Sequence, residues 1–415
     1  MRYLNQNNFV SESAKVLARA AMALNPVELI TPVNQAHEKE LWMTTEEGGP
    51  FINPQFQYDE FNLSQAAAKG EIVRIAADAL RSACYPESPM DDAILEILNH
   101  RVHDALCAAN MAASILLGSN SGGEYAQQIY GRPDKLQVLN CYRAATSTSD
   151  SKDDSSCFSE EKRHELLARS YDAFGIQREF QRIADIYGFR NWDIIIDNSA
   201  SAIDVRNKTS YGNPQVVIPK SRKVNGLKLA ELIGHELECH LRDSINAEAL
   251  FAEHLASTPL EPLIPLLAKS DDELFYEGHA KLSDVAVNGE SVSPHPYYVI
   301  AIDAALRNQS FADIGELIYK LRRNADQSHQ TALNGAWTAA YRAMRGAVDT
   351  HGGYAYTKDS AYWFGYETAT HIAQSAPYLL DFATLTLDEL RLLERAGFDL
   401  KHPRCPSQNL AAQFQ

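Results

Sequence analysis

The sequence lacks any apolar run of about 18 residues, the length that a transmembrane helix requires. Its first residues, MRYLNQNNFVSESAK, also lack the apolar centre of a secretory signal peptide. The six cysteines are scattered without a CxxC pair, which is typical of reduced thiols rather than of a disulfide framework. We therefore expect a cytoplasmic protein without membrane insertion, although export by a signal-free secretion machine would leave the same pattern.

Positive charge is also scarce, because the formal net charge is −16. This balance argues against general nucleic-acid binding and against binding to an anionic membrane surface. The chain has 415 residues, of which 45% are hydrophobic and 22% are charged. A chain of this length and composition can bury a sizeable core, in one large domain or in roughly two or three ordinary ones.

The hydrophobic pattern predicts an α+β chain that is mainly helical. Helical periodicity dominates, and two apolar runs, within NWDIIID and QVVIP, suit strands of a small sheet that precedes the segment LIGHELECHL. The low-complexity stretch TSTSDSKDDSS is typical of a flexible segment. We therefore predict a mainly helical N-terminal region at 1–145, a flexible linker or loop at 146–160, and a further domain at 161–415.

The segment LIGHELECHL places two histidines, His235 and His240, five positions apart. On an ideal helix, which turns by about 100° per residue, two such side chains point about 140° apart. A one-residue π-bulge would bring both imidazoles to one face, and such bulges favour functional sites. Glu236 follows the first histidine, where a glutamate can activate metal-bound water. The simpler interpretation is a buried helix with two hydrogen-bonded histidines.

A catalytic zinc ion needs a third protein ligand and one open position. The downstream segment DDELFYEGHAKLSDVAV offers Glu277, followed by the small residue Gly278, which suits tight helix packing. His279 is a competing ligand, and His254 is a weaker one because it lies in an ordinary amphipathic pattern. Cys239 has no local partner, so we interpret it as a small buried residue.

Several separated blocks resemble one known family, the HExxxH zinc metallopeptidases typified by the microtubule-associated tyrosine carboxypeptidase MATCAP and its bacterial relatives. The blocks that carry the resemblance are NPQFQY, SYGNPQVVIPKS, LIGHELECHLRDSIN, EGHA and YRAMRGAVDTHGGYAYTKDSAYWFGY. The resemblance is weak from about residue 25 to residue 395 and strong over 211–366. The chain departs from the family pattern at His279, where an apolar residue is usual, and in the TSTSDSKDDSS insertion.

The resemblance implies a zincin-like catalytic domain at 161–415 that binds one Zn²⁺ per chain. By that resemblance His235, His240 and Glu277 are the zinc ligands, and Glu236 is the general base. The chemistry also needs a donor for the oxyanion of the tetrahedral intermediate. Candidates in the matched downstream segment are Tyr362, Tyr354 and His351. Tyr362 lies in the aromatic-rich stretch AYWFGY and is equally well interpreted as a core residue.

A carboxypeptidase must also hold a terminal carboxylate, which Arg does as a bidentate fork and Lys as a point charge. The matched segment offers Arg342, Arg345 and Lys358, any of which could instead form a structural ion pair with Asp349 or Asp359. A basic run follows the strand QVVIP, which we expect at a sheet edge, and could hold an acidic peptide or form a solvated loop. Its cations are Lys220, Arg222, Lys223 and Lys228.

The sequence thus favours a zinc-dependent peptidase that acts on a peptide or protein substrate, with carboxypeptidase action at a C-terminal tail. An endopeptidase with the same metal site is the nearest alternative. A relative without activity that binds a partner protein is a third interpretation, but it would have no need of Glu236. A structural zinc site is the fourth interpretation. It would require Cys239 or His279 as an additional protein ligand of the ion.

Overall fold

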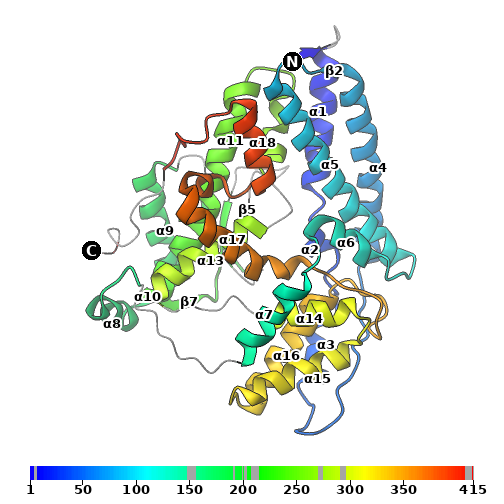
Figure 1. Ribbon diagram of the computed structural model, residues 1–415, viewed down its shortest axis with the longest axis vertical. Helices are drawn as coiled ribbons and strands as arrows, with labels where there is room; N and C mark the ends of the chain where they lie inside the picture. The colour runs from blue at the N-terminus through cyan, green and yellow to red at the C-terminus, as the bar shows by residue number, and fades with distance from the viewer. Residues whose placement is uncertain are drawn as a thin grey trace.

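A computed structural model describes most of the chain. The described residues are 1–3, 7–146, 156–189, 192–198, 200, 203–206, 215–269, 274–289, 296–406 and 414. The predicted linker at 146–160 falls largely on 147–155, which lie outside them. The fold is mainly helical with a few short strands, which confirms the predicted class (Figure 1). None of the described helices combines the length and the apolar character needed to cross a membrane.

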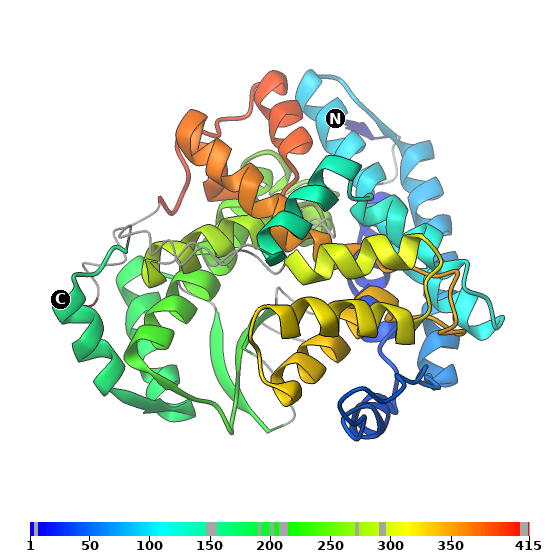
Figure 2. The ribbon, with the colours of Figure 1, turned by 60° about the horizontal axis from the view of Figure 1, so that its bottom comes forward.

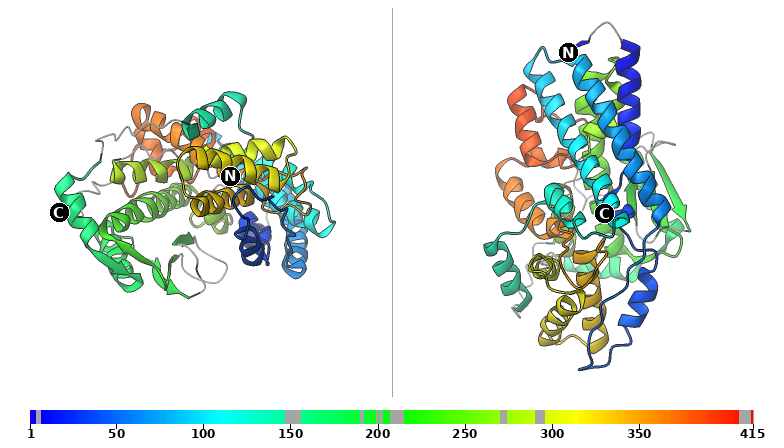
Figure 3. Two further views of the ribbon diagram at one scale, coloured as in Figure 1. Left: turned by 90° about the horizontal axis from the view of Figure 1, so that it is seen from below. Right: turned by 90° about the vertical axis from the view of Figure 1, so that its right-hand side faces the viewer.

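Long helices dominate the N-terminal third, where α1, α4 and α5 run side by side (Figure 3). Asp59 begins α4 by accepting hydrogen bonds from the backbone N–H groups of Phe61 and Asn62, and Ser88 caps α5 in the same way. The elements are β1 (Arg2–Tyr3), α1 (Asn7–Met22), α2 (Pro26–Leu29), α3 (Gln35–Trp42), α4 (Glu60–Ala83), β2 (Cys84–Tyr85), α5 (Pro89–Leu116), α6 (Gly122–Tyr130) and α7 (Lys135–Thr146).

The small sheet precedes the helix that carries LIGHELECHL, here called the motif helix, as the sequence predicts. The sheet lies in the green segment of Figure 2. Its strand order is β4-β6-β5, with β4 parallel and β5 antiparallel to β6, while β3 and β7 form a separate antiparallel pair. The elements of this region are α8 (Glu160–Ala168), β3 (Ser170–Asp172), α9 (Ala173–Tyr187), β4 (Asp193–Asp197), β5 (Asp204–Arg206), β6 (Gln215–Pro219) and β7 (Lys223–Asn225).

One sheet prediction is wrong. The strand QVVIP, β6, lies in the middle of its sheet and not at an edge. The reason is visible in its composition, because Val216, Val217 and Ile218 are fully buried, and a continuous apolar run suits a strand covered on both faces. The basic run after it therefore borders a central strand, and Lys223 belongs to β7, which pairs with β3.

The C-terminal half begins with a continuous rod from Gly226 to Leu255, of which η1 is the middle. Helix α13 packs between this rod and α17. The elements are α10 (Gly226–Leu232), η1 (Ile233–Leu241), α11 (Arg242–Leu255), η2 (Glu261–Leu263), α12 (Ile264–Leu267), α13 (Leu274–Asn288), α14 (Pro296–Leu306), α15 (Phe311–Asn324), α16 (His329–Met344), η3 (Lys358–Ser360), α17 (Ala361–Ser375), η4 (Pro377–Phe382) and α18 (Leu387–Ala396).

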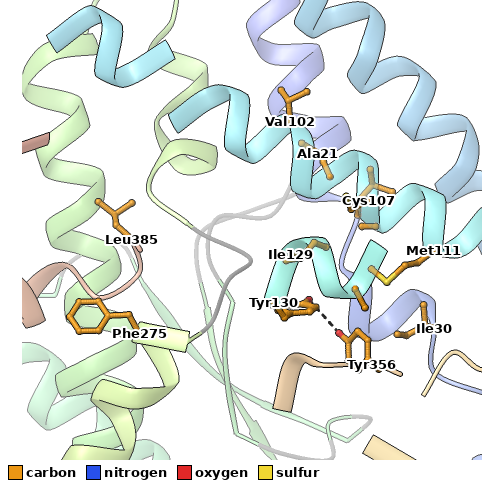
Figure 4. Close-up of a cluster of buried hydrophobic side chains, with 14 of the residues drawn as sticks. Ala21, Ile30, Val102, Cys107, Met111, Ile129, Tyr130, Phe275, Tyr356 and Leu385 are labelled. Carbon is orange, nitrogen blue, oxygen red and sulfur yellow. Dashed lines mark hydrogen bonds between the residues drawn. The ribbon is translucent and has the colours of Figure 1, made fainter. Parts of the chain in front are cut away.

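Two hydrophobic cores hold these elements. The smaller one lies under the sheet and the motif helix, and the larger one combines the N-terminal helices with residues from 247–400. Figure 4 shows part of the larger core, with Val102, Cys107 and Met111 along α5 and with Ile129 and Tyr130 on α6, which packs against α5. The hydroxyl of Tyr356 donates a hydrogen bond of 3.3 Å to that of Tyr130. The larger core thus draws on both sides of the predicted linker, and the domain boundaries stay a prediction.

A buried ion pair joins α5 to α18. Arg101 donates two hydrogen bonds to the carboxylate of Glu389, of 2.7 and 2.9 Å, and both side chains are almost wholly buried. Burial raises the pKa of Glu389, but the charge of Arg101 and the hydrogen bonds outweigh it and hold that pKa at about 2. Glu389 also closes the capping box of α18 with Thr386.

We predict that Glu389→Gln lowers the free energy of unfolding at pH 7 by about 3–5 kcal/mol, because Arg101 stays buried without a counter-charge. The folded pKa of Glu389 lies below the unfolded value of about 4.3, so the pair stabilises fully above that value and loses its effect as the pH falls toward about 2. Urea unfolding at several pH values measures this. The exposed Glu394→Gln on the same helix is the control, and an equal effect of both variants contradicts the prediction.

Candidate metal centre

The central feature of the site is a widened helix. Residues Ile233–Leu241 form a nine-residue π-helix inside the rod, so the predicted π distortion is confirmed and is longer than a single bulge. Hydrogen bonds from i to i+5 bring residues five apart to one face. The ring centroids of His235 and His240 consequently lie 4.7 Å apart, with the rings nearly perpendicular. The two histidines are neighbours in space.

Glu277 completes the group from the neighbouring helix α13. One ligand atom from each of His235, His240 and Glu277 lies within 4.8 Å of the other two. Nε2 of His235 is 3.9 Å from Oε2 of Glu277. His240 is buried, whereas the His235 and Glu277 side chains keep 18% and 14% of their surface exposed, so the group is accessible from one side. The structure therefore brings together the three residues that the sequence singled out.

The donor set fits zinc. Two imidazoles and one carboxylate with an open side are the ligands of many catalytic zinc sites, and bonds of about 2.0–2.2 Å in tetrahedral geometry put ligand atoms roughly 3.5 Å apart. The 3.9 Å between His235 and Glu277 is close to that separation. The His240 ring stacks on Tyr276 at 3.8 Å, and its Nδ1 is buried without a hydrogen-bond partner in the described part of the chain.

The surroundings shift the pKa values of the two imidazoles in opposite directions. Burial lowers the pKa of His235, but the hydrogen bond to Asp284 and the charges of Glu236 and Glu277 outweigh it and raise that pKa to about 9. The pKa of His240 is held well below its usual value, first by burial and then by the charge of His235. Acidic groups thus surround His235, and Glu236, itself buried, is one of them.

A contact between two glycines sets the distance between α13 and α17. A Cβ on Gly278 would overlap the backbone of Gly365, and a Cβ on Gly365 would overlap the carbonyl of Leu274. This confirms the expectation of tight packing at Gly278. Tyr362 lies one turn before Gly365, and the nearby charge of Glu277, followed by burial, raises the pKa of its hydroxyl. Of the three oxyanion candidates, Tyr362 therefore lies beside the cluster of His235, His240 and Glu277, here called the metal group.

The other two oxyanion candidates have different surroundings. Tyr354 is buried against Gly346 and the N-terminal end of α6. His351 is exposed and pairs with Asp349 at 2.8 Å.

The alternative ligands lie outside the group. Nδ1 of His279 is 2.8 Å from Oδ2 of Asp243, and Nε2 of His254 is 3.0 Å from Oδ1 of Asp91. Cys239 is buried, as expected, with its sulfur 3.7 Å from the His279 carbonyl oxygen. These contacts favour Glu277 as the third ligand.

The three predicted carboxylate-binding cations are placed differently. Arg342 pairs with Asp359 at 2.7 Å, and its guanidinium lies 4.9 Å from the ring centre of Tyr298 and 5.8 Å from that of Tyr362. Arg342 thus forms the structural pair that the sequence left open as an alternative, yet it remains next to the site. Lys358 also lies near the site. Its positive charge favours a lower pKa for both His240 and Tyr362, but burial and other charges have larger effects on these two pKa values.

Arg345 has a different aromatic neighbour from Arg342. Its guanidinium packs 4.9 Å from the ring centre of Tyr341, a residue of the larger core. Within the basic run after β6, Lys228 forms an ion pair with Glu231, while Lys220 and Lys223 are exposed. The sequence missed one polar neighbour of the cluster, Asp284, whose Oδ1 lies 3.2 Å from Nδ1 of His235. Its place seven residues after Glu277 on one helix was the available signal.

Comparison with models of known protein families and with curated proteins gives no match. The resemblance to the HExxxH metallopeptidases thus remains a prediction based on the motifs.

We predict that Gly278→Ala destabilises the fold by about 1–3 kcal/mol, because the new methyl group meets backbone atoms that can move only if α13 and α17 separate. Thermal unfolding measures the effect. Gly335→Ala is the matched control, since it is also a helix glycine but the three atoms nearest to its Cβ all belong to the side chain of Arg322 and not to a backbone. Equal stability of the two variants would show that the crossing at Gly278 is not tight.

Proposed function

We propose that the chain is a zincin-like zinc peptidase that hydrolyses a peptide bond of a peptide or protein substrate, with carboxypeptidase action at a C-terminus. One observation carries the proposal. His235, His240 and Glu277 converge within 4.8 Å, and Glu236 directly follows the first of them. A group that only stabilised the fold would have no need of a further buried carboxylate at that position.

The three ligands would hold one Zn²⁺ per chain. When bound, the zinc ion polarises the scissile carbonyl and lowers the pKa of water. A structural zinc site requires a fourth protein ligand, whereas the group of described residues that could hold a metal ion has three members. The exposed side of His235 and Glu277 therefore favours a catalytic site over a structural one.

Glu236 and Tyr362 would act on the reacting groups. A carboxylate oxygen of Glu236 would take a proton from the attacking water and pass it to the leaving amine nitrogen. The raised pKa of Tyr362, caused first by Glu277 and then by burial, keeps its hydroxyl protonated. That hydroxyl is consequently able to donate a hydrogen bond to the oxyanion of the intermediate.

The cations beside the site support exopeptidase action. Lys358 and Arg342 lie next to the metal group, and either could attract the carboxylate of a substrate's last residue. Arg342 pairs with Asp359, and we propose Lys358 as the anchor because its charge acts on both His240 and Tyr362. An endopeptidase would have no use for such an anchor. A non-catalytic relative that binds a partner protein is the remaining alternative, which the retained Glu236 argues against.

We predict that Glu236→Gln retains about one zinc ion per chain but loses peptide hydrolysis, because Gln keeps the shape of Glu and cannot accept the proton. His235→Ala is expected to lose both zinc and hydrolysis. Metal analysis and mass spectrometry of a peptide library measure the two properties separately. Products shortened by one C-terminal residue support a carboxypeptidase, and internal fragments support the endopeptidase. Full activity of Glu236→Gln would reject Glu236 as the base.

We predict that Lys358→Met raises the KM for peptides with a free C-terminal carboxylate by about tenfold or more, since a charge-assisted hydrogen bond contributes about 1.5–3 kcal/mol. C-terminally amidated peptides should be poor substrates of the wild type and little affected by the substitution. The exposed Lys220→Met is the control for a lost surface charge. An unchanged KM for the free-acid peptides would remove Lys358 from substrate binding.

A further inference from the structure

The His235 ring lies between two carboxylates of the same helix. Helix α13 carries Glu277, Lys281 and Asp284 at spacings of four and three residues, which places all three on one face. Nε2 of His235 lies 3.9 Å from Oε2 of Glu277, and Nδ1 lies 3.2 Å from Oδ1 of Asp284. Each ring nitrogen therefore faces a different carboxylate of α13.

This arrangement decides which nitrogen is able to bind a metal ion. A neutral imidazole carries its hydrogen on one nitrogen and a lone pair on the other. A carboxylate at Nδ1 accepts the hydrogen there and leaves the lone pair on Nε2, which faces Glu277. We propose that Asp284 is a positioning residue that fixes His235 as an Nε2 ligand. This inference rests on the proposed zinc site.

Asp284 is itself held in place. Nζ of Lys281 lies 2.6 Å from Oδ2 of Asp284, so each carboxylate oxygen has its own partner. The Asp284 side chain is 7% exposed, and water therefore competes little for these bonds.

A second contact prevents α13 from turning away from the motif helix. His279, on α13 between Glu277 and Lys281, forms a buried pair with Asp243 of α11 at 2.8 Å. The pair of His235 with Asp284 ties the motif helix to α13, and the pair of His279 with Asp243 ties α13 to the next turns of the same rod. With α13 fixed at two points, the position of Asp284 relative to His235 is set by the fold.

The test is an equilibrium zinc titration in competition with a chromophoric chelator, on the full chain. We expect Asp284→Ala to weaken zinc binding by about 10–100-fold, the usual effect of losing such a partner. Asp284→Asn keeps an oxygen that accepts from Nδ1 and should recover part of the affinity. Asp91→Ala is the matched control, because Asp91 is a buried carboxylate bonded to His254 outside the metal group. It should lower stability and leave zinc affinity unchanged.

The outcomes separate the two ideas. Wild-type zinc affinity in Asp284→Ala, or an Asp284→Asn variant that binds as weakly as Asp284→Ala, overturns the positioning role and leaves the zinc proposal intact. A wild-type chain that binds no zinc overturns both. Unfolding of each variant in excess chelator, measured in parallel, shows whether an affinity change follows stability. If Asp284→Ala does not fold, an Asp284→Asn affinity below that of both the wild type and Asp91→Ala supports the role, and an affinity equal to theirs overturns it.

Discussion

The period of the α-helix is the constraint on which the candidate site depends. Ordinary turns would direct His235 and His240 away from each other, and only the wider turns of η1 bring their rings within 4.7 Å. Such a distortion persists only where its surroundings hold it. Here eight of its nine residues are buried, with α13 on one side and the sheet core on another. The packing around η1 therefore stabilises the geometry that the spacing of the histidines demands.

The second requirement is the close approach of α13. Two helices normally lie 8–10 Å apart depending on the side chains between them, and glycines at the contact allow the closest approach. The contact of Gly278 with Gly365 fixes α17 against α13, one residue after Glu277 and one turn after Tyr362. A possible ligand and a possible hydrogen-bond donor are thus placed by the same backbone contact. The glycine contact of α13 with α17 and the polar pairs of α13 with the rod thus act together to place the site.

The sequence predicts the parts of the site that depend on local spacing. His235, His240 and Glu236 follow from one motif, the π distortion follows from the five-residue interval, and Glu277 follows from the small residue beside it. The contact of Asp284 with His235 was not predicted, and the Arg342–Asp359 pair was only one of several alternatives, because periodicity does not encode how distant segments fold together. The central place of β6 was missed for a similar reason. The sequence predicts strands within NWDIIID and QVVIP, and β5, which pairs with the other side of β6, lies outside both runs.

The net charge of −16 gives little guide to the charge at the site. Around the metal group the acids and bases alternate: Lys281 faces Asp284, and Arg342 faces Asp359. These two pairs hold the side chains of Lys281 and Arg342 in place. Lys358 is the first residue of η3, and its positive charge acts on both His240 and Tyr362. Fields between buried groups are screened less than those of the distant surface, so the local charges, and not the net charge, act on the pKa values of His240 and Tyr362.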